Sequence, residues 1–183
     1  KHLSQLPAVE LLVAMGYSFI SPSAALRQRQ DKYSQVLLEG ILGEQLKRIN
    51  RISYKNNHYR FSEENIQSAI QKLKGVKYDG FLKTNENIYD LLTLGTALDQ
   101  SFYGDSRSFT LNYIDWDHPD RNAFHAAVEY SVERNRSMET ARPDIVLFVN
   151  GIPFAIIECK SPKEDIAQAV SQSIRNQGDD YIP

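Results

Sequence analysis

The stretch RPDIVLFVNGIPFAIIECKSP, residues 142–162, determines how the rest of the chain is interpreted. Two apolar runs flank Asn150-Gly151, and Asn-Gly between apolar runs is the strongest short-range signal of a β-hairpin. The stretch therefore predicts two paired strands, residues 143–149 and 152–161, that belong to a buried sheet.

Charged residues stand at the far ends of these two predicted strands. Asp144 opens the first strand, and Glu158 and Lys160 close the second. Charges are costly to bury unless they are paired or bind something, so their position on core strands needs an explanation. A salt bridge at a solvated strand end is the simpler alternative, because charge pairs at such positions are common.

The register of the hairpin decides whether the three charges share one face of the sheet. A turn of two residues would place Asp144 opposite Ile157 and point Glu158 to the other face. A three-residue loop, residues 149–151, would place Asp144 opposite Ile156, on the same face as Glu158 and the lysine. We predict the three-residue loop, because it brings all three charges together.

Two carboxylates that converge at a strand end form a site suited to a hard cation. Mg²⁺ is typically held by one or two carboxylates and completes its shell with waters and substrate phosphate. Bound there, it can stabilise phosphoryl oxygens and activate water for attack. A neighbouring lysine can contact the scissile phosphate or orient the attacking water. Asp144 and Glu158 are therefore the predicted metal ligands, with Lys160 as the third catalytic residue.

Composition narrows the class of protein. The chain has 183 residues, of which 42% are hydrophobic and 24% charged, which suits one packed domain. A formal net charge of −2 argues against a strongly basic nucleic-acid coat, and the single cysteine excludes an internal disulfide framework. There is no long apolar run and no signal-peptide pattern, so we expect a soluble cytoplasmic protein that does not engage a membrane. Neither chain end resembles a natural terminus, which suggests a part of a larger polypeptide.

The first hundred residues are predicted to be mainly helical. Serines at residues 21 and 62 are the expected N-caps, and glycines at 16, 75 and 95 the expected stops. The pattern then changes to period-2 alternation, which predicts strands, and returns to helical spacing after Pro162. The predicted helices are residues 6–16, 21–30, 34–49, 62–75, 84–95 and 163–177, and the further strands are 108–116 and 122–133.

Pro143-Asp144, followed after thirteen residues by Glu158-Cys159-Lys160, resembles the PD-(D/E)xK nuclease superfamily. The longer text ETARPDIVLFVNGIPFAIIECKSP, followed by DIAQAVSQSIRNQ, is similar to the nuclease region of type I restriction enzyme R subunits. FSEENIQSAIQKLK, YDGFLKTNENIYDLLTLG and SFTLNYIDW are similar to the N-terminal region of the same family, so the resemblance covers most of the chain.

The resemblance implies an α+β or α/β fold with a restriction-endonuclease-like core, a mixed, mainly antiparallel sheet flanked by helices. It implies one endonuclease domain over residues 1–183, with a mainly helical region at 1–107 and the αβ core at 108–183. It also implies Mg²⁺ as cofactor, double-stranded DNA as substrate, and a complex with methyltransferase and specificity subunits. ATP and S-adenosylmethionine would bind elsewhere in that complex. The ATP-driven motor would lie downstream, since this chain has no G-x-x-x-x-G-K-[ST] phosphate loop.

Further residues follow from the family's auxiliary motifs. Many such nucleases carry Q-x-x-x-Y on the helix after the lysine, which leaves two placements open. Gln172 has the better position but lacks the tyrosine, whereas Gln177 and Tyr181 match the letters across Gly178. Glu10, on the first predicted helix, is the candidate for a third acid at the metal.

Two other functions stay open at this point. The chain could serve mainly as a docking and DNA-positioning module of the same complex, with little nuclease activity alone. It could also be a related stand-alone PD-(D/E)xK nuclease.

Overall fold

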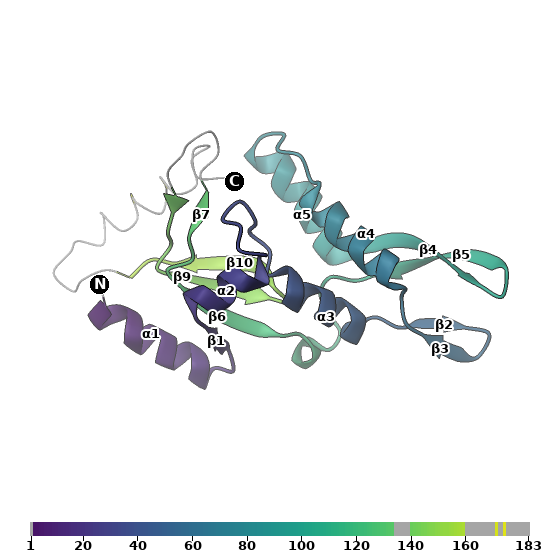
Figure 1. Ribbon diagram of the computed structural model, residues 1–183, viewed down its shortest axis with the longest axis horizontal. Helices are drawn as coiled ribbons and strands as arrows, with labels where there is room; N and C mark the ends of the chain where they lie inside the picture. The colour runs from purple at the N-terminus through teal and green to yellow at the C-terminus, as the bar shows by residue number, and fades with distance from the viewer. Residues whose placement is uncertain (1, 134–139, 160–170, 172–173, 175–183) are drawn as a thin grey trace. The chain divides into compact units, whose positions relative to one another are not determined.

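The computed structural model describes residues 2–133, 140–159, 171 and 174 (Figure 1). The chain divides into two compact units, which are described separately. The first, Lys1–Leu38 with Ala123–Pro183, is called the sheet unit here, and the second, Glu39–Asn122, the hairpin unit. The predicted boundary between the helical region and the αβ core lay at residue 107. The observed division differs, because the strands near residue 107 fold with their neighbours inside the hairpin unit.

A four-stranded sheet forms the centre of the sheet unit (Figure 1). Its order is β1-β6-β9-β10, with β1 parallel to β6 and the other neighbours antiparallel. The predicted mixed, mainly antiparallel sheet is confirmed, although β1 falls in the region expected to be helical. A short separate ribbon pairs β7 with β8. The strands are β1 (Ser18–Ile20), β6 (Phe124–Val128), β7 (Val132–Glu133), β8 (Thr140–Ala141), β9 (Ile145–Val149) and β10 (Ile152–Ile157).

Helix α1 (His2–Ala14) covers one face of this sheet (Figure 1). Its residues Ala8, Val9 and Leu12 share a helix face and pack on a buried cluster that includes Ala126 and Cys159. The helix begins before the predicted residue 6 and carries Pro7 inside it. It ends as expected near Gly16, whose φ of +100° is one that glycine adopts readily.

The opposite face of the sheet is packed by aromatic and cationic side chains. Tyr130 and Phe148 meet edge to face with ring centroids 5.1 Å apart. The buried Arg29 guanidinium lies 4.0 Å from the centre of the Tyr130 ring and donates to the carbonyl of Ser131 at 2.8 Å. Arg29 follows α2 (Pro22–Gln28), which begins at the predicted Ser21 cap. These contacts fix the chain that leaves β6.

The turn between β9 and β10 contains only two residues, so the predicted three-residue loop is wrong. Val149 pairs with Ile152, and Asn150 and Gly151 have φ values of +53° and +83°. Positive φ at both central positions is the geometry for which Asn-Gly is favoured in hairpins. Asn150 is fully buried and exchanges hydrogen bonds of 2.8 Å with the backbone of Ala123, which anchors the turn to β6.

A β-bulge in β10 then changes the register. Pro153 pairs with Phe148 but Ala155 pairs with Leu147, which leaves Phe154 as an extra residue. Past the bulge Ile157 pairs with Ile145, one residue further along than the turn alone would give. The bulge therefore restores the parity that the prediction assigned to the loop, although it shifts the register by one residue in the opposite direction, toward Glu158 and not toward Ile156.

The hairpin unit alternates helices with two-stranded antiparallel ribbons (Figure 1). Ser62 caps α4 as predicted, accepting a bond from the Asn65 amide, and Gly95 ends α5 with φ +71°. The ribbons β2–β3 and most of β4–β5 lie in the region expected to be mainly helical, and the strand expected at 108–116 ends at Leu111. The elements are α3 (Glu39–Ile49), β2 (Ile52–Tyr54), β3 (Asn57–Tyr59), α4 (Glu63–Lys74), α5 (Phe81–Leu94), β4 (Thr96–Phe102), β5 (Asp105–Leu111) and the 3₁₀ turn η1 (Pro119–Arg121).

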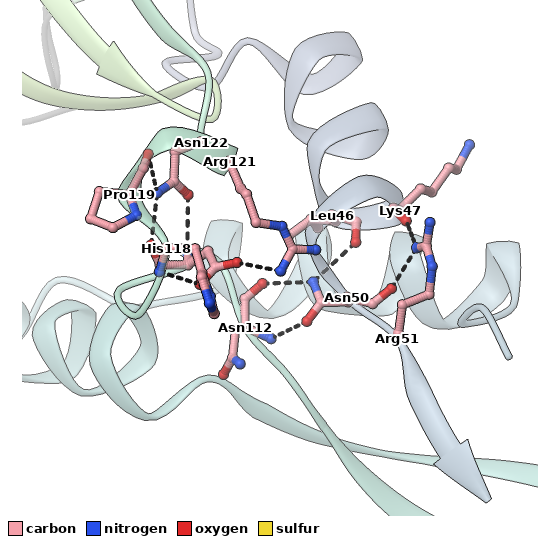
Figure 2. Close-up of polar contacts among 10 residues, drawn as sticks. Leu46, Lys47, Asn50, Arg51, Asn112, His118, Pro119, Arg121 and Asn122 are labelled. Atoms are coloured by element: carbon pink, nitrogen blue, oxygen red, sulfur yellow. Dashed lines mark hydrogen bonds and ion pairs between the residues drawn. The ribbon is translucent and has the colours of Figure 1, made fainter. Parts of the chain in front are cut away.

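Side-chain amides connect the end of α3 to the segment after β5 (Figure 2). Asn50 donates to the carbonyls of Leu46 and Asn112 and accepts from the Asn112 amide at 2.8 Å. The two bonds with Asn112 satisfy backbone groups that lie just beyond the end of β5. No helix in the described part of the chain is long and apolar enough to cross a membrane.

Candidate metal centre

Asp144 lies directly before β9 and is held by three neighbouring segments. Its side chain is buried, and Oδ2 accepts a hydrogen bond of 2.9 Å from the backbone amide of Cys159. Its carbonyl accepts one bond of 3.0 Å from the Glu129 amide and another of 2.8 Å from Nε2 of Gln5. A buried carboxylate with such charge-assisted contacts is fixed in position, as a metal ligand must be.

Glu158 directly follows β10, just as Asp144 directly precedes β9. The ladder ends with the pair Ile145–Ile157, and one further step places Asp144 opposite Glu158. Residues directly opposite each other in an antiparallel pair point to the same face of the sheet, with Cβ atoms about 5 Å apart. The two acids therefore share the face opposite α1, while the Cys159 side chain, one residue on, packs under α1.

The chemistry of this donor pair fits Mg²⁺. One or two carboxylates are the usual protein share of a magnesium site, the rest coming from water and substrate phosphate. Two facing carboxylates repel each other, and a cation between them would relieve that repulsion. Within the described residues no three His, Cys, Asp or Glu side chains gather as a metal-binding group, so the pair has no third protein ligand there.

Several predicted site residues lie outside the described residues. These are Lys160, Gln172, Gln177 and Tyr181, so their roles stay predictions. Glu10 is described, and its side chain is exposed on α1. The α1 residue that bonds to Asp144 is Gln5, so a third metal ligand at Glu10 also stays a prediction.

Gln5 was missed at the sequence level because the predicted helix began at residue 6. Gln5 shares the spacing of Ala8, Val9 and Leu12, the residues that face the sheet. Extending the apolar face of the predicted helix back by one turn would have placed the polar side chain of Gln5 at a core position. A polar residue at such a position requires a hydrogen-bond partner, and here the partner is Asp144.

Glu129 and His125 lie near the centre without an assigned role in it. Glu129 directly follows β6 with φ +49°, and Arg142 approaches its carboxylate at 4.0 Å. His125 lies within β6, and burial lowers the pKa of its imidazole from the ordinary 6.5. Its burial within β6 is that of a structural residue.

Comparison with known proteins gives a consistent family assignment. The family described as type I restriction enzyme R protein N terminus matches residues 1–183. A candidate type I restriction enzyme endonuclease subunit of Methanocaldococcus jannaschii, MjaIXP, is 27% identical over 86% of this chain and 15% of its own length. A second from the same organism, MjaVIIIP, is 32% identical over 78% of this chain and 13% of its own.

The type I restriction enzyme HindI endonuclease subunit of Haemophilus influenzae is 26% identical over 60% of this chain. This chain thus spans between 11% and 15% of the length of these three relatives. No solved structure matches the chain. The mixed α+β architecture is consistent with a restriction-endonuclease-like fold. Since the family match extends over all 183 residues, the chain belongs to the family of type I restriction enzyme R protein N-terminal regions.

Proposed function

We propose that this chain is the Mg²⁺-dependent endonuclease region of a type I restriction R subunit and hydrolyses phosphodiester bonds of double-stranded DNA. The observation that supports the proposal is the register of β9 and β10, whose last pair is Ile145–Ile157 and which, continued by one residue, brings Asp144 opposite Glu158. Its relatives are named as endonuclease subunits, which supports the same activity. In this proposal the protein works in the cytoplasm, with methyltransferase and specificity subunits and a downstream ATP-driven motor as partners. S-adenosylmethionine binds elsewhere in that complex.

Each residue has a separate task in the proposed reaction. Asp144 and Glu158 hold the cation, and the Cys159 amide fixes the Asp144 carboxylate in one orientation. When bound, Mg²⁺ supplies positive charge to the phosphate oxygens and favours deprotonation of the attacking water. Lys160 orients that water and contacts the scissile phosphate. The described residues include no base-reading helix, so little sequence preference is expected of this region itself.

Cleavage of plasmid DNA by the reconstituted restriction complex in Mg²⁺ tests the proposal. We expect Asp144→Ala and Lys160→Ala each to slow cleavage by about 100-fold or more, because each removes several kcal/mol of stabilisation from the transition state. DNA-stimulated ATP hydrolysis by the same complexes should be unchanged, which shows that the variants fold and assemble. Glu86→Ala, which alters an exposed acid on α5, is the matched control. Cleavage at the wild-type rate by both Asp144→Ala and Lys160→Ala would refute the catalytic assignment.

A docking function is the second candidate, and α5 supports it. None of its residues is buried, and Leu82 and Leu94 are 76% and 71% exposed. Exposed apolar side chains on one helix are characteristic of surfaces that another protein covers. If Leu82→Ser together with Leu94→Ser abolished assembly of the complex while Asp144→Ala left cleavage intact, docking would be the main role of this region.

A further inference from the structure

Gln5 makes the one described side-chain contact between α1 and the backbone of Asp144. Its Nε2 donates to the Asp144 carbonyl at 2.8 Å, across 139 positions of sequence. The side chain is 8% exposed, so water does not compete strongly for the amide. A hydrogen bond in such surroundings holds its two partners in a defined geometry.

The position would suit an apolar side chain if packing were its only task. The neighbours of Gln5 on the same helix face, Ala8, Val9 and Leu12, pack against an apolar cluster with Cys159. Burying an amide in such an interface is unfavourable unless the amide is hydrogen-bonded. The chain nevertheless places a glutamine there, and its amide reaches the residue proposed as metal ligand.

The hydrogen bond from Gln5 acts on the backbone of Asp144, which lies at the edge of the β-ladder. Strand β9 begins at Ile145, so Asp144 lies just outside the regular strand. Its carbonyl receives Gln5 from α1 and the Glu129 amide from the end of β6, while its carboxylate receives the Cys159 amide. Gln5 adds the contact from outside the sheet, and so limits rotation of the peptide that carries the aspartate.

We propose that Gln5 is a positioning residue that holds the Asp144 carboxylate in the orientation needed to bind the metal. The inference rests on the proposed function, because it takes Asp144 as a ligand of Mg²⁺. In this proposal α1 raises the affinity for the metal through the backbone of Asp144, and no acidic residue of α1 has to bind the metal. Gln5 itself contacts neither the cation nor DNA in this proposal.

The test replaces Gln5 with methionine, which has a similar length and no donor. Mn²⁺ binding to the full-length subunit is measured by water-proton relaxation without DNA, and the Asp144→Ala subunit gives the background of other sites. We expect Gln5→Met to weaken the Asp144-dependent binding by about fivefold, the factor expected for one neutral hydrogen bond. The Mg²⁺ concentration for half-maximal plasmid cleavage should rise by a similar factor, with the rate at saturating Mg²⁺ less affected.

Val9→Ala is the matched control, because Val9 packs on the same face of α1 and has no polar contact with Asp144. It should lower thermal stability and leave metal binding at the wild-type value. A Gln5→Met subunit with wild-type metal affinity, or a Val9→Ala subunit with the same loss as Gln5→Met, overturns the inference. If Gln5→Met does not fold, Gln5→Asn withdraws the amide by one methylene and gives the same comparison. If Asp144→Ala cleaves DNA normally, it is the proposed function that fails.

Discussion

At the scale of single residues, His125 shows how burial changes the pKa of a side chain. Its side chain lies in β6, between Ser18 of β1 and Phe148 of β9 in the register. The Nδ1 atom is buried and has no hydrogen-bond partner within the described residues. Burial disfavours the charged imidazolium, which lowers the pKa of His125 from its ordinary 6.5. The folded protein therefore binds this proton less readily than the unfolded chain.

A lowered histidine pKa predicts a loss of stability in acid. The contribution of His125 is fully present above the unfolded value of about 6.5 and is lost as the pH falls through the folded pKa. We expect the free energy of unfolding in urea to fall between pH 7 and pH 5, and His125→Gln to make this fall shallower. Equal slopes for His125→Gln and the wild type would contradict the prediction.

At the scale of elements, the bulge in β10 decides which side chains meet. Without it, the turn at residues 150–151 would set Asp144 opposite Ile157 and point Glu158 to the other face. The extra residue, Phe154, is 64% exposed, so it contributes little to the core. The bulge gives this extra residue no partner in β9, and in that way keeps the register on which the two acids depend.

This dependence predicts different outcomes for deletion and insertion in β10. Deleting Phe154 makes the ladder regular and leaves Asp144 opposite Glu158, so cleavage by the complex should stay within about threefold of wild type. Inserting one alanine after Phe154 shifts Glu158 by one position and turns it to the other face, so cleavage should fall by about 100-fold. Circular dichroism checks that both variants keep their secondary structure. Comparable activity of the two variants would show that the register does not control the site.

The sequence predicted some elements well and others poorly, for physical reasons. Ser21 and Ser62 were identifiable because an N-cap is a local interaction, and the strand pair around Asn150-Gly151 because its turn signal is local too. The bulge at Phe154 was not predictable, since every residue near it is apolar and fits either face. The three-residue strands β2 and β3 were missed because so short a run carries no clear period.

The candidate site, too, was predictable in part from local sequence and in part not. Asp144 and Glu158 were placed on one face from strand parity, and the observed register up to Ile145–Ile157 keeps that parity through a different irregularity from the one expected. The contact from Gln5 joins residues far apart in sequence, and no local pattern identifies its partner.

At the scale of the whole molecule, each of the two units contains a deeply buried tyrosine. Tyr113 of the hairpin unit donates to the Ala69 carbonyl at 2.7 Å, and burial raises its pKa to about 12. Tyr130 of the sheet unit donates to the Val36 carbonyl at 2.9 Å, and burial raises its pKa even though Arg29 opposes the shift. Both phenols must stay protonated for the units to remain folded.

Raised phenol pKa values predict a loss of stability in alkali. The stabilisation is fully present below the ordinary value of about 10 and is lost as the pH rises through the folded pKa. We expect Tyr113 and Tyr130 to ionise late in a titration followed by near-ultraviolet absorbance. Tyr113→Phe and Tyr130→Phe should each remove one late phenol, and Tyr113→Phe should cost about 1 kcal/mol of unfolding free energy through its lost hydrogen bond. Ionisation of Tyr113 and Tyr130 near pH 10 would contradict this.

Cys159 has one further consequence for experiment. Its amide holds the Asp144 carboxylate, while its thiol is buried against Leu12 of α1. Because it is the only cysteine of the chain, a thiol reagent has one target. Because Leu12 of α1 packs in the same cluster, lifting α1 from the sheet would uncover that sulfur, and the same motion would withdraw Gln5 from Asp144. The rate of alkylation therefore reports, without metal or DNA, how often the candidate centre comes apart.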